Sequence, residues 1–284
     1  MAIFSNQATL TYNGNSTNSN IAYGEILDVL TATKTAVEGT YAPGETVTYV
    51  VTLRNTGGST LTGVTITDDL GGYTFGGTTV YPLTYVTNSA TLFINGVPQP
   101  APAVTAGPPV AVSGLTIPAG GDLVLVYQAV ANAFADPAVG GTIVNTVAVT
   151  GDGITTPITA TETVTAESAP DLTISKSISP SQVVDNDRVT YTFVIQNTGN
   201  EAVLATDNAA ITDTFDPILT ALTVTFEGAA WTQGVQYAYD ETTGLFNTLP
   251  GALTVPAATY TQDPVTGAYT LTPGIVTLTV TGTI

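Results

Sequence analysis

Cysteine and histidine are both absent from the 284 residues of this chain. Without thiols and imidazoles there can be no cysteine nucleophile, no histidine base and almost no zinc or copper site. Disulfide bonds are excluded as well, so an exported protein of this sequence needs another covalent brace or none. Serine and aspartate remain as reactive groups, but no conventional catalytic triad can be built without histidine. We therefore predict that the protein is not an enzyme.

Positive charge is nearly absent, with four basic residues against 22 acidic ones and a net charge of −18. Binding to phosphate backbones or anionic membranes requires clustered Lys and Arg, so we expect neither nucleic acid nor a membrane as partner. No segment approaches the roughly 20 apolar residues of a membrane-spanning helix, and residues 1–7 lack the features of a signal peptide.

Carboxylates cluster at 68–69, 151–153 and 185–187. The favoured interpretation is that they lie in polar turns, and the alternative is that they bind calcium as a cofactor. No other cofactor is expected.

The residues that are abundant favour an all-β protein. Thr, Val, Ala and Gly dominate, 43% of the chain is hydrophobic, and no long segment has helical periodicity. β-Branched residues pack well on a pleated surface. The length suits two β-sandwich domains of about 100 residues each.

An internal repeat is the strongest pattern in the sequence. A lysine is followed by an alternating strand with a central tyrosine, then by Asn-Thr-Gly, and then by a short strand that ends in aspartate. The interval from lysine to tyrosine to asparagine is the same in both copies, while three extra residues precede the second aspartate. Insertions in loops cost little. The repeated positions are Lys34, Tyr49, Asn55 and Asp68 in the first copy, and Lys176, Tyr191, Asn197 and Asp213 in the second.

Each copy alternates with a period of two residues, as a half-buried strand does. Together the two motifs resemble the bacterial surface repeat catalogued as domain of unknown function 11. The resemblance covers both copies and implies immunoglobulin-like Greek-key sandwich domains strung along a cell-surface protein. It implies no activity.

The second copy lacks the last strand of the first. Residues 141–151 form an alternating strand in the first copy, and nothing equivalent follows residue 280. A similar strand occurs instead near the N-terminus, where Asn6 aligns with Asn145. This alignment places Phe4, Ala8 and Leu10 on the positions of three apolar residues, Ile143, Val147 and Val149.

We therefore predict three parts: an N-terminal donor strand (1–14), a first domain (15–151) and a second domain (152–284) without its last strand. Residues 20–26 are expected to form another strand that leads into the first domain, and 152–171 to be its counterpart and the inter-domain connection. An incomplete sandwich exposes an unpaired edge, which a donor strand from a second copy can fill. The predicted donor residues are Phe4, Ala8, Leu10 and Tyr12, and the predicted acceptor edge is Val276, Leu278 and Val280.

Repetition of this head-to-tail contact would give an open filament on a bacterial cell or spore surface. Two alternatives stay open at this stage: a piece cut from a longer repeat protein, or an N-terminal strand that folds back onto its own domain. The alternative function is that of an adhesin module that binds a glycan or host protein through aromatic side chains in residues 216–270.

The equivalent lysines suggest a second kind of brace. A buried lysine beside Asn or Asp and a carboxylate can form an isopeptide bond. The candidate groups are Lys34 with Asn55 or Asp68, and Lys176 with Asn197 or Asp213; the alternative is that each lysine pairs with its aspartate and each asparagine holds a turn.

Overall fold

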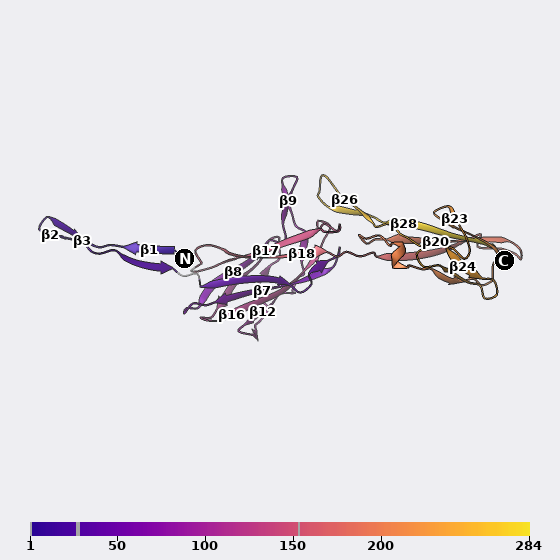
Figure 1. The fold of residues 1–284 in the computed structure, drawn as a ribbon. Helices are drawn as coiled ribbons and strands as arrows, with labels where there is room; N and C mark the ends of the chain where they lie inside the picture. Colours follow the sequence, from indigo (N-terminus) through magenta and orange to yellow (C-terminus); the bar gives the residue numbers. More distant parts are fainter. Residues whose placement is uncertain (1, 27–28, 153) are drawn as a thin grey trace.

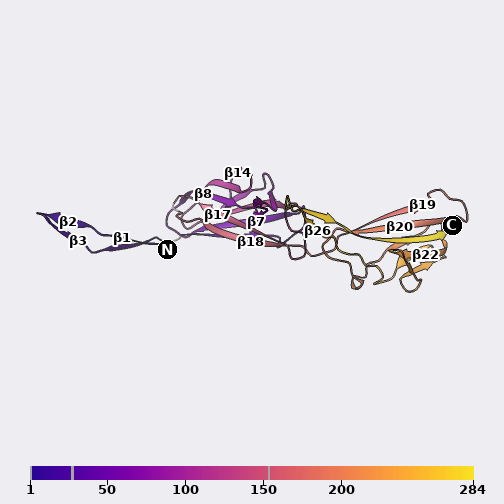
Figure 2. The same cartoon turned by 90° about the horizontal axis from the view of Figure 1, so that it is seen from above.

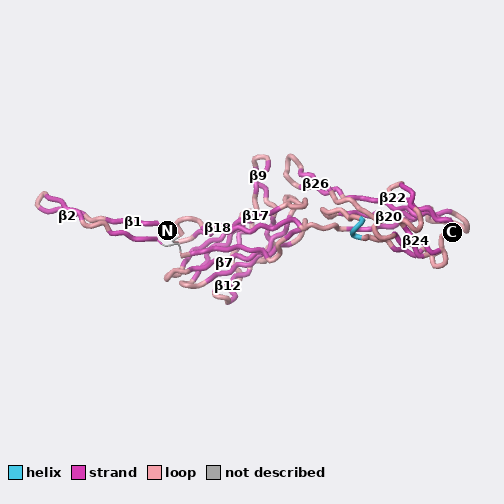
Figure 3. The backbone as a smooth tube through the Cα atoms, in the orientation of Figure 1, coloured by secondary structure: helices cyan, strands magenta, loops and turns pink. Residues whose placement is uncertain are grey.

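The computed structural model describes residues 2–26, 29–152 and 154–284. Strands account for nearly all of its regular structure; Figure 3 shows the single short helix among them, the 3₁₀ turn η1 (Ala205–Asp207). The molecule is elongated, with a slender N-terminal ribbon, a first domain and a second domain following one another along one axis (Figure 1). Figure 2 shows the same succession from above.

The first domain is a sandwich of two sheets, as the alternating pattern predicts. In both sheets the spatial order of the strands differs from their order in the sequence. Inward residues such as Val47, Tyr49, Val51 and Leu53 are fully buried in one core. One sheet contains, in spatial order, β13 (Val97–Pro98), β12 (Thr91–Ile94), β16 (Asp122–Ala131), β7 (Thr46–Asn55) and β5 (Leu30–Ala36), with β11 (Leu83–Tyr85) on β16. The other contains β14 (Val104–Thr105), β15 (Val110–Ile117), β8 (Leu61–Asp68), β17 (Thr142–Thr150), β18 (Ile158–Ala166) and β6 (Thr40–Tyr41).

The second domain repeats the first sheet and has a reduced second sheet. Its larger sheet contains β19 (Leu172–Ser179), β20 (Arg188–Asn197), β28 (Gly274–Thr283), β22 (Thr220–Phe226) and β23 (Ala229–Trp231). The smaller one contains β21 (Thr212–Thr214), β25 (Leu245–Thr248) and β24 (Tyr237–Asp240). A separate core of apolar side chains lies between them. The chain is thus all-β with two immunoglobulin-like domains, as predicted.

Two hairpins meet beside the junction of the domains. They are formed by β9 (Tyr73–Phe75) with β10 (Thr78–Val80), and by β26 (Thr259–Gln262) with β27 (Tyr269–Thr272). The Tyr269 amide donates to the Ala133 carbonyl at 2.7 Å, and Gln262 Nε2 donates to the Tyr73 hydroxyl at 3.3 Å. The second domain is therefore held against the first by its own hairpin as well as by the connecting chain.

The strand pairing changes the predicted boundaries. Residues 22–26, which the sequence assigned to the first domain, pair with residues 2–6 instead. Strand β18, which was expected to belong to the second domain, completes the first by pairing with all but the last residue of β17. The structure therefore groups residues 2–26 as a ribbon, 30–166 as the first domain and 172–284 as the second, with 167–171 between the domains.

Candidate assembly surfaces and lysine clusters

Strand β17 supplies the part of the first domain that the second domain lacks. It pairs with β8 on one side, with Val147 opposite Asp68, and with β18 on the other. Its inward residues Ile143, Val147 and Val149 are at most 1% exposed. Strand β18 in turn packs across the sandwich against β5. These two strands therefore close one complete side of the first domain.

In the second domain the corresponding side is open. Strand β21, which carries Asp213 at the position of Asp68, pairs with β25 alone, and no described residue pairs with its other edge. Strand β19 is the counterpart of β5, yet all of its residues are exposed. Ile174 is 57% exposed, whereas Ala32, its counterpart in β5, is partly buried against the core. The difference follows from the absence, among the described residues, of strands that play the parts of β17 and β18.

The predicted acceptor edge is wrong. Val276, Leu278 and Val280 lie on β28, which pairs with β20 on one side and with β22 on the other, and all three are buried. Strand β28 is the counterpart of β16, a central strand, so its edges are already used. The unpaired edge that corresponds to the place of β17 is that of β21, in the opposite sheet.

The N-terminal residues form a two-stranded ribbon rather than a single strand. Strands β1 (Ala2–Asn6) and β4 (Ala22–Ile26) pair near the first domain, and β2 (Thr9–Tyr12) and β3 (Asn15–Asn18) pair further out. Asn13 and Gly14 at the tip both have positive φ, the requirement of a type I′ hairpin turn. Figure 1 shows the ribbon extending away from both domains.

All four predicted donor residues lie on this ribbon and are exposed, Phe4 at 57%, Leu10 at 63% and Tyr12 at 55%. The ribbon forms no ladder with either domain among the described residues, so the fold-back alternative is not what the structure adopts. The ribbon and the β17–β18 hairpin have the same plan of two antiparallel strands. Three large apolar side chains, Phe4, Leu10 and Tyr12, are thus exposed on an otherwise mostly polar ribbon.

The first lysine is fully buried in an ion pair. Lys34 Nζ donates to Asp68 Oδ2 at 2.7 Å, and the Tyr127 hydroxyl donates to the same oxygen. The other carboxylate oxygen accepts the amide of Leu70 at 2.7 Å. The ammonium also lies 4.8 Å from the ring centre of Tyr49. Burial lowers the pKa of Lys34, and the attraction of Asp68 only partly opposes this.

A buried asparagine outside the predicted lysine partners lies beside this pair. Asn145 is 0% exposed, and neither its Nδ2 nor its Oδ1 has a hydrogen-bond partner. Its amide faces the hydroxyls of Tyr49 and Tyr127, whose pKa values are raised, chiefly by burial. The cluster thus contains an amine, a carboxylate and an unpaired amide.

Asn55 and Asn197, the asparagines that were predicted to lie with the lysines, hold turns instead. Asn55 Nδ2 donates to the Ser59 and Pro118 carbonyls, and its Oδ1 accepts the Gly57 amide. Asn197 makes the equivalent bonds in the second domain. Their amides are fully engaged, so the isopeptide pairing with either asparagine is wrong.

The second lysine is in the same arrangement but is open to solvent. Lys176 pairs with Asp213, and its Nζ lies 4.6 Å from the ring centre of Tyr191, the counterpart of Tyr49. The Lys176 side chain is 39% exposed, against 0% for Lys34. The position of Tyr127 is taken by Val280, which lies opposite Tyr191 in the sheet. This cluster has no asparagine at the place of Asn145 among the described residues of its own domain.

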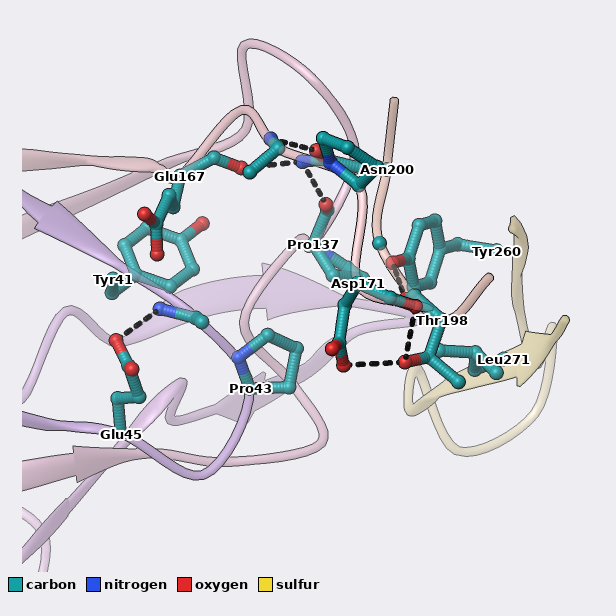
Figure 4. A pocket seen from close by; sticks show the side chains of 14 residues that line it. Tyr41, Pro43, Glu45, Pro137, Glu167, Asp171, Thr198, Asn200, Tyr260 and Leu271 are labelled. Atoms are coloured by element: carbon teal, nitrogen blue, oxygen red, sulfur yellow. Dashed lines mark hydrogen bonds between the residues drawn. The ribbon is translucent and has the colours of Figure 1, made fainter. Parts of the chain in front are cut away.

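A cavity of about 530 Å³ lies at the domain junction (Figure 4). Asn200 bridges it, since its Nδ2 donates to the Pro137 carbonyl at 2.9 Å and to the Glu167 carbonyl at 2.6 Å. Thr198 Oγ1 donates to Asp171 Oδ2 at 2.6 Å. Because these bonds tie the two domains and the connecting chain together, we interpret the cavity as part of a joint.

The aromatic residues of the second domain contribute mainly to its core. Tyr237, Tyr239 and Phe246 are at most 7% exposed, and Trp231 packs on Phe226 with ring centres 5.0 Å apart. They do not form the exposed aromatic surface that the adhesin alternative requires.

In the ranges 2–26, 29–152 and 154–284, no helix is long and apolar enough to span a membrane, and no three acidic side chains gather where a metal ion could bind. The candidate calcium loops at 68–69 and 185–187 lie within these ranges. The third candidate, 151–153, includes Gly153, which lies outside the described residues.

No family model and no curated protein matches the chain. Among solved structures, the pilus backbone protein RrgB of Streptococcus pneumoniae is 10% identical over 86% of this chain and 55% of its own, with a TM-score of 0.34. A 35 kDa C-terminal fragment of the major pilin GBS80 of Streptococcus agalactiae is 12% identical over 87% of this chain and 79% of its own (TM-score 0.37). A collagen-binding domain of a Staphylococcus aureus adhesin is 13% identical over 50% and 99% (TM-score 0.31). These are likenesses of fold only.

Proposed function

We propose that the protein is the subunit of an extracellular filament on a bacterial cell or spore surface, assembled head to tail. The ribbon of one subunit enters the open side of the second domain of the next subunit, where it takes the two places that β17 and β18 hold in the first domain. The observation that carries this proposal is the match between an unfilled two-strand site and a free two-strand ribbon in one chain.

The sequence of the ribbon supports its place in the site. The alignment of Asn6 with Asn145 puts Phe4, Ala8 and Leu10 on the three inward positions of β17. Phe4 pairs with Gly24 across the ribbon, as Ile143 pairs with Val164 in the first domain. The large Phe4 and the small Gly24 would thus occupy the places of Ile143 and Val164, which are both of medium size.

Charge also supports it. The whole chain carries a net charge of −18, but residues 2–24 contain no Asp, Glu, Lys or Arg. Like charges brought together at an interface oppose association. Residues 2–24 therefore bring no charge of their own to a contact with a second copy of this acidic molecule.

The energetics allow a stable joint. Burying an exposed Phe4, Leu10 or Tyr12 contributes roughly 1.5–3 kcal/mol each, and each new ladder hydrogen bond adds about 0.5–1.5 kcal/mol. Association costs about 4–15 kcal/mol. A ribbon paired along β21 exceeds this cost only when most of its contacts form, so we expect assembly to be sensitive to single inward substitutions.

The order of the strands along the chain is consistent with a filament in which each domain follows a two-stranded element. In the first domain, β18 leads through 167–171 into β19, the first strand of the second domain. In the ribbon, β4 ends at Ile26 and β5, the first strand of the first domain, begins at Leu30. An inserted ribbon would therefore stand before the first strand of a first domain, as β18 stands before the first strand of the second.

Deletion of residues 2–26 tests the proposal. We expect the full chain to form filaments visible by negative-stain electron microscopy, and the deleted chain to remain monomeric with both domains folded. Addition of a peptide of residues 2–26 should raise the melting temperature of the second domain in the deleted chain and leave that of the first unchanged, because a ligand stabilises only the domain that it binds. Filaments formed by the deleted chain would contradict the proposal.

A further inference from the structure

The buried cluster of the first domain is costly as a set of separate groups. An ion pair taken out of water must recover a desolvation cost of several kcal/mol for each ion. A buried amide without hydrogen bonds costs about 1–3 kcal/mol more. Lys34 carries the first of these costs and Asn145 the second, and an amide bond between them would remove the buried ammonium and the unpaired Nδ2 together.

The same three groups recur at the joint between subunits, but divided between two chains. Lys176 and Asp213 take the positions of Lys34 and Asp68 in the repeat. The third position, that of Asn145, is held in the ribbon by Asn6. This third position is filled only if the ribbon enters the second domain, so the inference rests on the proposed function.

We propose that assembly brings Asn6 of one subunit against Lys176 and Asp213 of the next, and that Lys176 Nζ then bonds covalently to Asn6 Cγ, as Lys34 Nζ does to Asn145 Cγ within the first domain. The filament is thereby cross-linked at every joint without an enzyme. Insertion also covers Lys176, which is 39% exposed in the free subunit. Burial is what lowers the pKa of Lys34, and a neutral amine is the nucleophilic form.

The reaction balances without an oxidant or another reactant. The ammonium first transfers one proton to the aspartate, which gives a neutral amine and a carboxylic acid. Nζ then attacks Cγ of the asparagine, and the acid relays a proton from Nζ to Nδ2. The Cγ–Nδ2 bond breaks, the released ammonia takes the proton of the acid and leaves as ammonium, the carboxylate is restored, and an amide remains between the two side chains. Asp68 and Asp213 each lie within hydrogen-bonding reach of their lysine, as this relay requires.

Boiling filaments in SDS tests the inference on the full chain. We expect a ladder of covalent multimers from the wild type. Trypsin has four cleavage sites in this sequence, after Lys34, Arg54, Lys176 and Arg188. Cleavage should fail after both lysines, and mass spectrometry should find residue 6 joined to residue 176 with loss of one ammonia.

The Asn6→Ala variant separates assembly from cross-linking. Because Asn6 is exposed and pairs with Ala22 within the ribbon, this variant should fold normally and form filaments that dissociate into monomers on boiling. Its intact mass should still be one ammonia below that of the sequence, owing to the Lys34–Asn145 bond. Asn15→Ala, on the return strand of the ribbon, is the matched control and should retain the ladder.

Three results overturn the inference, and each is distinct from the others. Wild-type filaments that dissolve into monomers of unmodified mass would exclude the cross-link while leaving the proposed function in place. A wild type that forms no filaments at all would remove the proposed function, and the inference with it. A ladder that persists in both Asn6→Ala and Lys176→Met would show that other groups make the covalent contact.

Discussion

The ring of Phe4 lies over Gly24, its direct partner across the ribbon. A Cβ added at residue 24 would be 2.2 Å from the nearest ring carbon. Gly24→Ala must therefore swing Phe4 out of this position. Loss of one apolar anchor worth roughly 1.5–3 kcal/mol should weaken assembly about 10- to 100-fold.

The critical concentration for filament formation, measured by light scattering, checks this prediction. Gly39→Ala is the control, since no atom lies within 4 Å of a Cβ at that position. Equal critical concentrations for the two variants would show that the Phe4–Gly24 pair does not enter the acceptor site.

A charge on one face of β2 should disrupt filaments far more than the same charge on the other face. Leu10 is predicted to face the acceptor core, so Leu10→Asp would bury an unpaired charge at a cost of several kcal/mol and should abolish filaments. Thr9→Asp places the same charge on the opposite face of the strand and should have a much milder effect. Electron microscopy of both variants at equal concentration decides the register. Similar behaviour of the two would refute it.

The exposed face of β19 should be needed for assembly but not for folding. Ile174 is 57% exposed in the subunit, so Ile174→Asp should leave the thermal unfolding of the monomer nearly unchanged. In the filament the same residue would face the inserted ribbon, and the variant should not polymerise. Thr173→Asp, its neighbour on the other face, should polymerise normally. A large fall in monomer stability would indicate that Ile174 is covered within its own chain.

The first domain should lose stability in alkali. Burial and the neighbouring Asp68 carboxylate raise the pKa of Tyr127 well above that of an exposed tyrosine. Because the folded-state pKa is the higher one, this contribution is fully present below the unfolded-state pKa of about 10 and is lost as pH rises through the folded-state value. Tyr49 lies in the same cluster and acts with the same sign.

Thermal unfolding between pH 8 and 12 checks this prediction. Tyr127→Phe should be less stable at neutral pH, by about 1.5–3 kcal/mol for a hydrogen bond to a charged group. It should also lose less stability than the wild type as pH rises. Tyr23→Phe, at an exposed ribbon position, should match the wild type. An alkaline loss that is the same in all three proteins would place the titrating groups elsewhere.

The sequence predicted the two sandwiches because their strands repeat the same alternation and the same turn residues. It also predicted that one strand of the second domain is missing and that its likeness lies at residues 3–10. It did not predict the ribbon, because residues 15–20 are polar and Asn-rich and show little alternation. That segment becomes a strand through its turn at Asn13–Gly14 and its pairing with β2.

The error at β28 had a different origin. The sequence predicts an edge at Val276, Leu278 and Val280 because the missing strand would follow them in sequence. In this sandwich the strand that follows β16 in sequence, β17, lies in the other sheet. A strand that is missing after β28 therefore leaves its gap in the opposite sheet and not beside β28. The asparagine beside the buried ion pair could have been found, since the alignment of residues 3–10 depends on Asn145.

The direction of β18 determines how a filament of this kind would bear tension. Strand β5 begins at the ribbon end of the first domain, and β18 ends at the opposite end beside β6, where Thr165 is paired with Thr40. A stretching force along the chain therefore acts on the sandwich at opposite ends and shears the strands along one another. Ladder hydrogen bonds, which lie across the strands, are then strained simultaneously. A ribbon inserted in place of β17 and β18 would be loaded in the same shear geometry, the one in which a short strand pair resists rupture best.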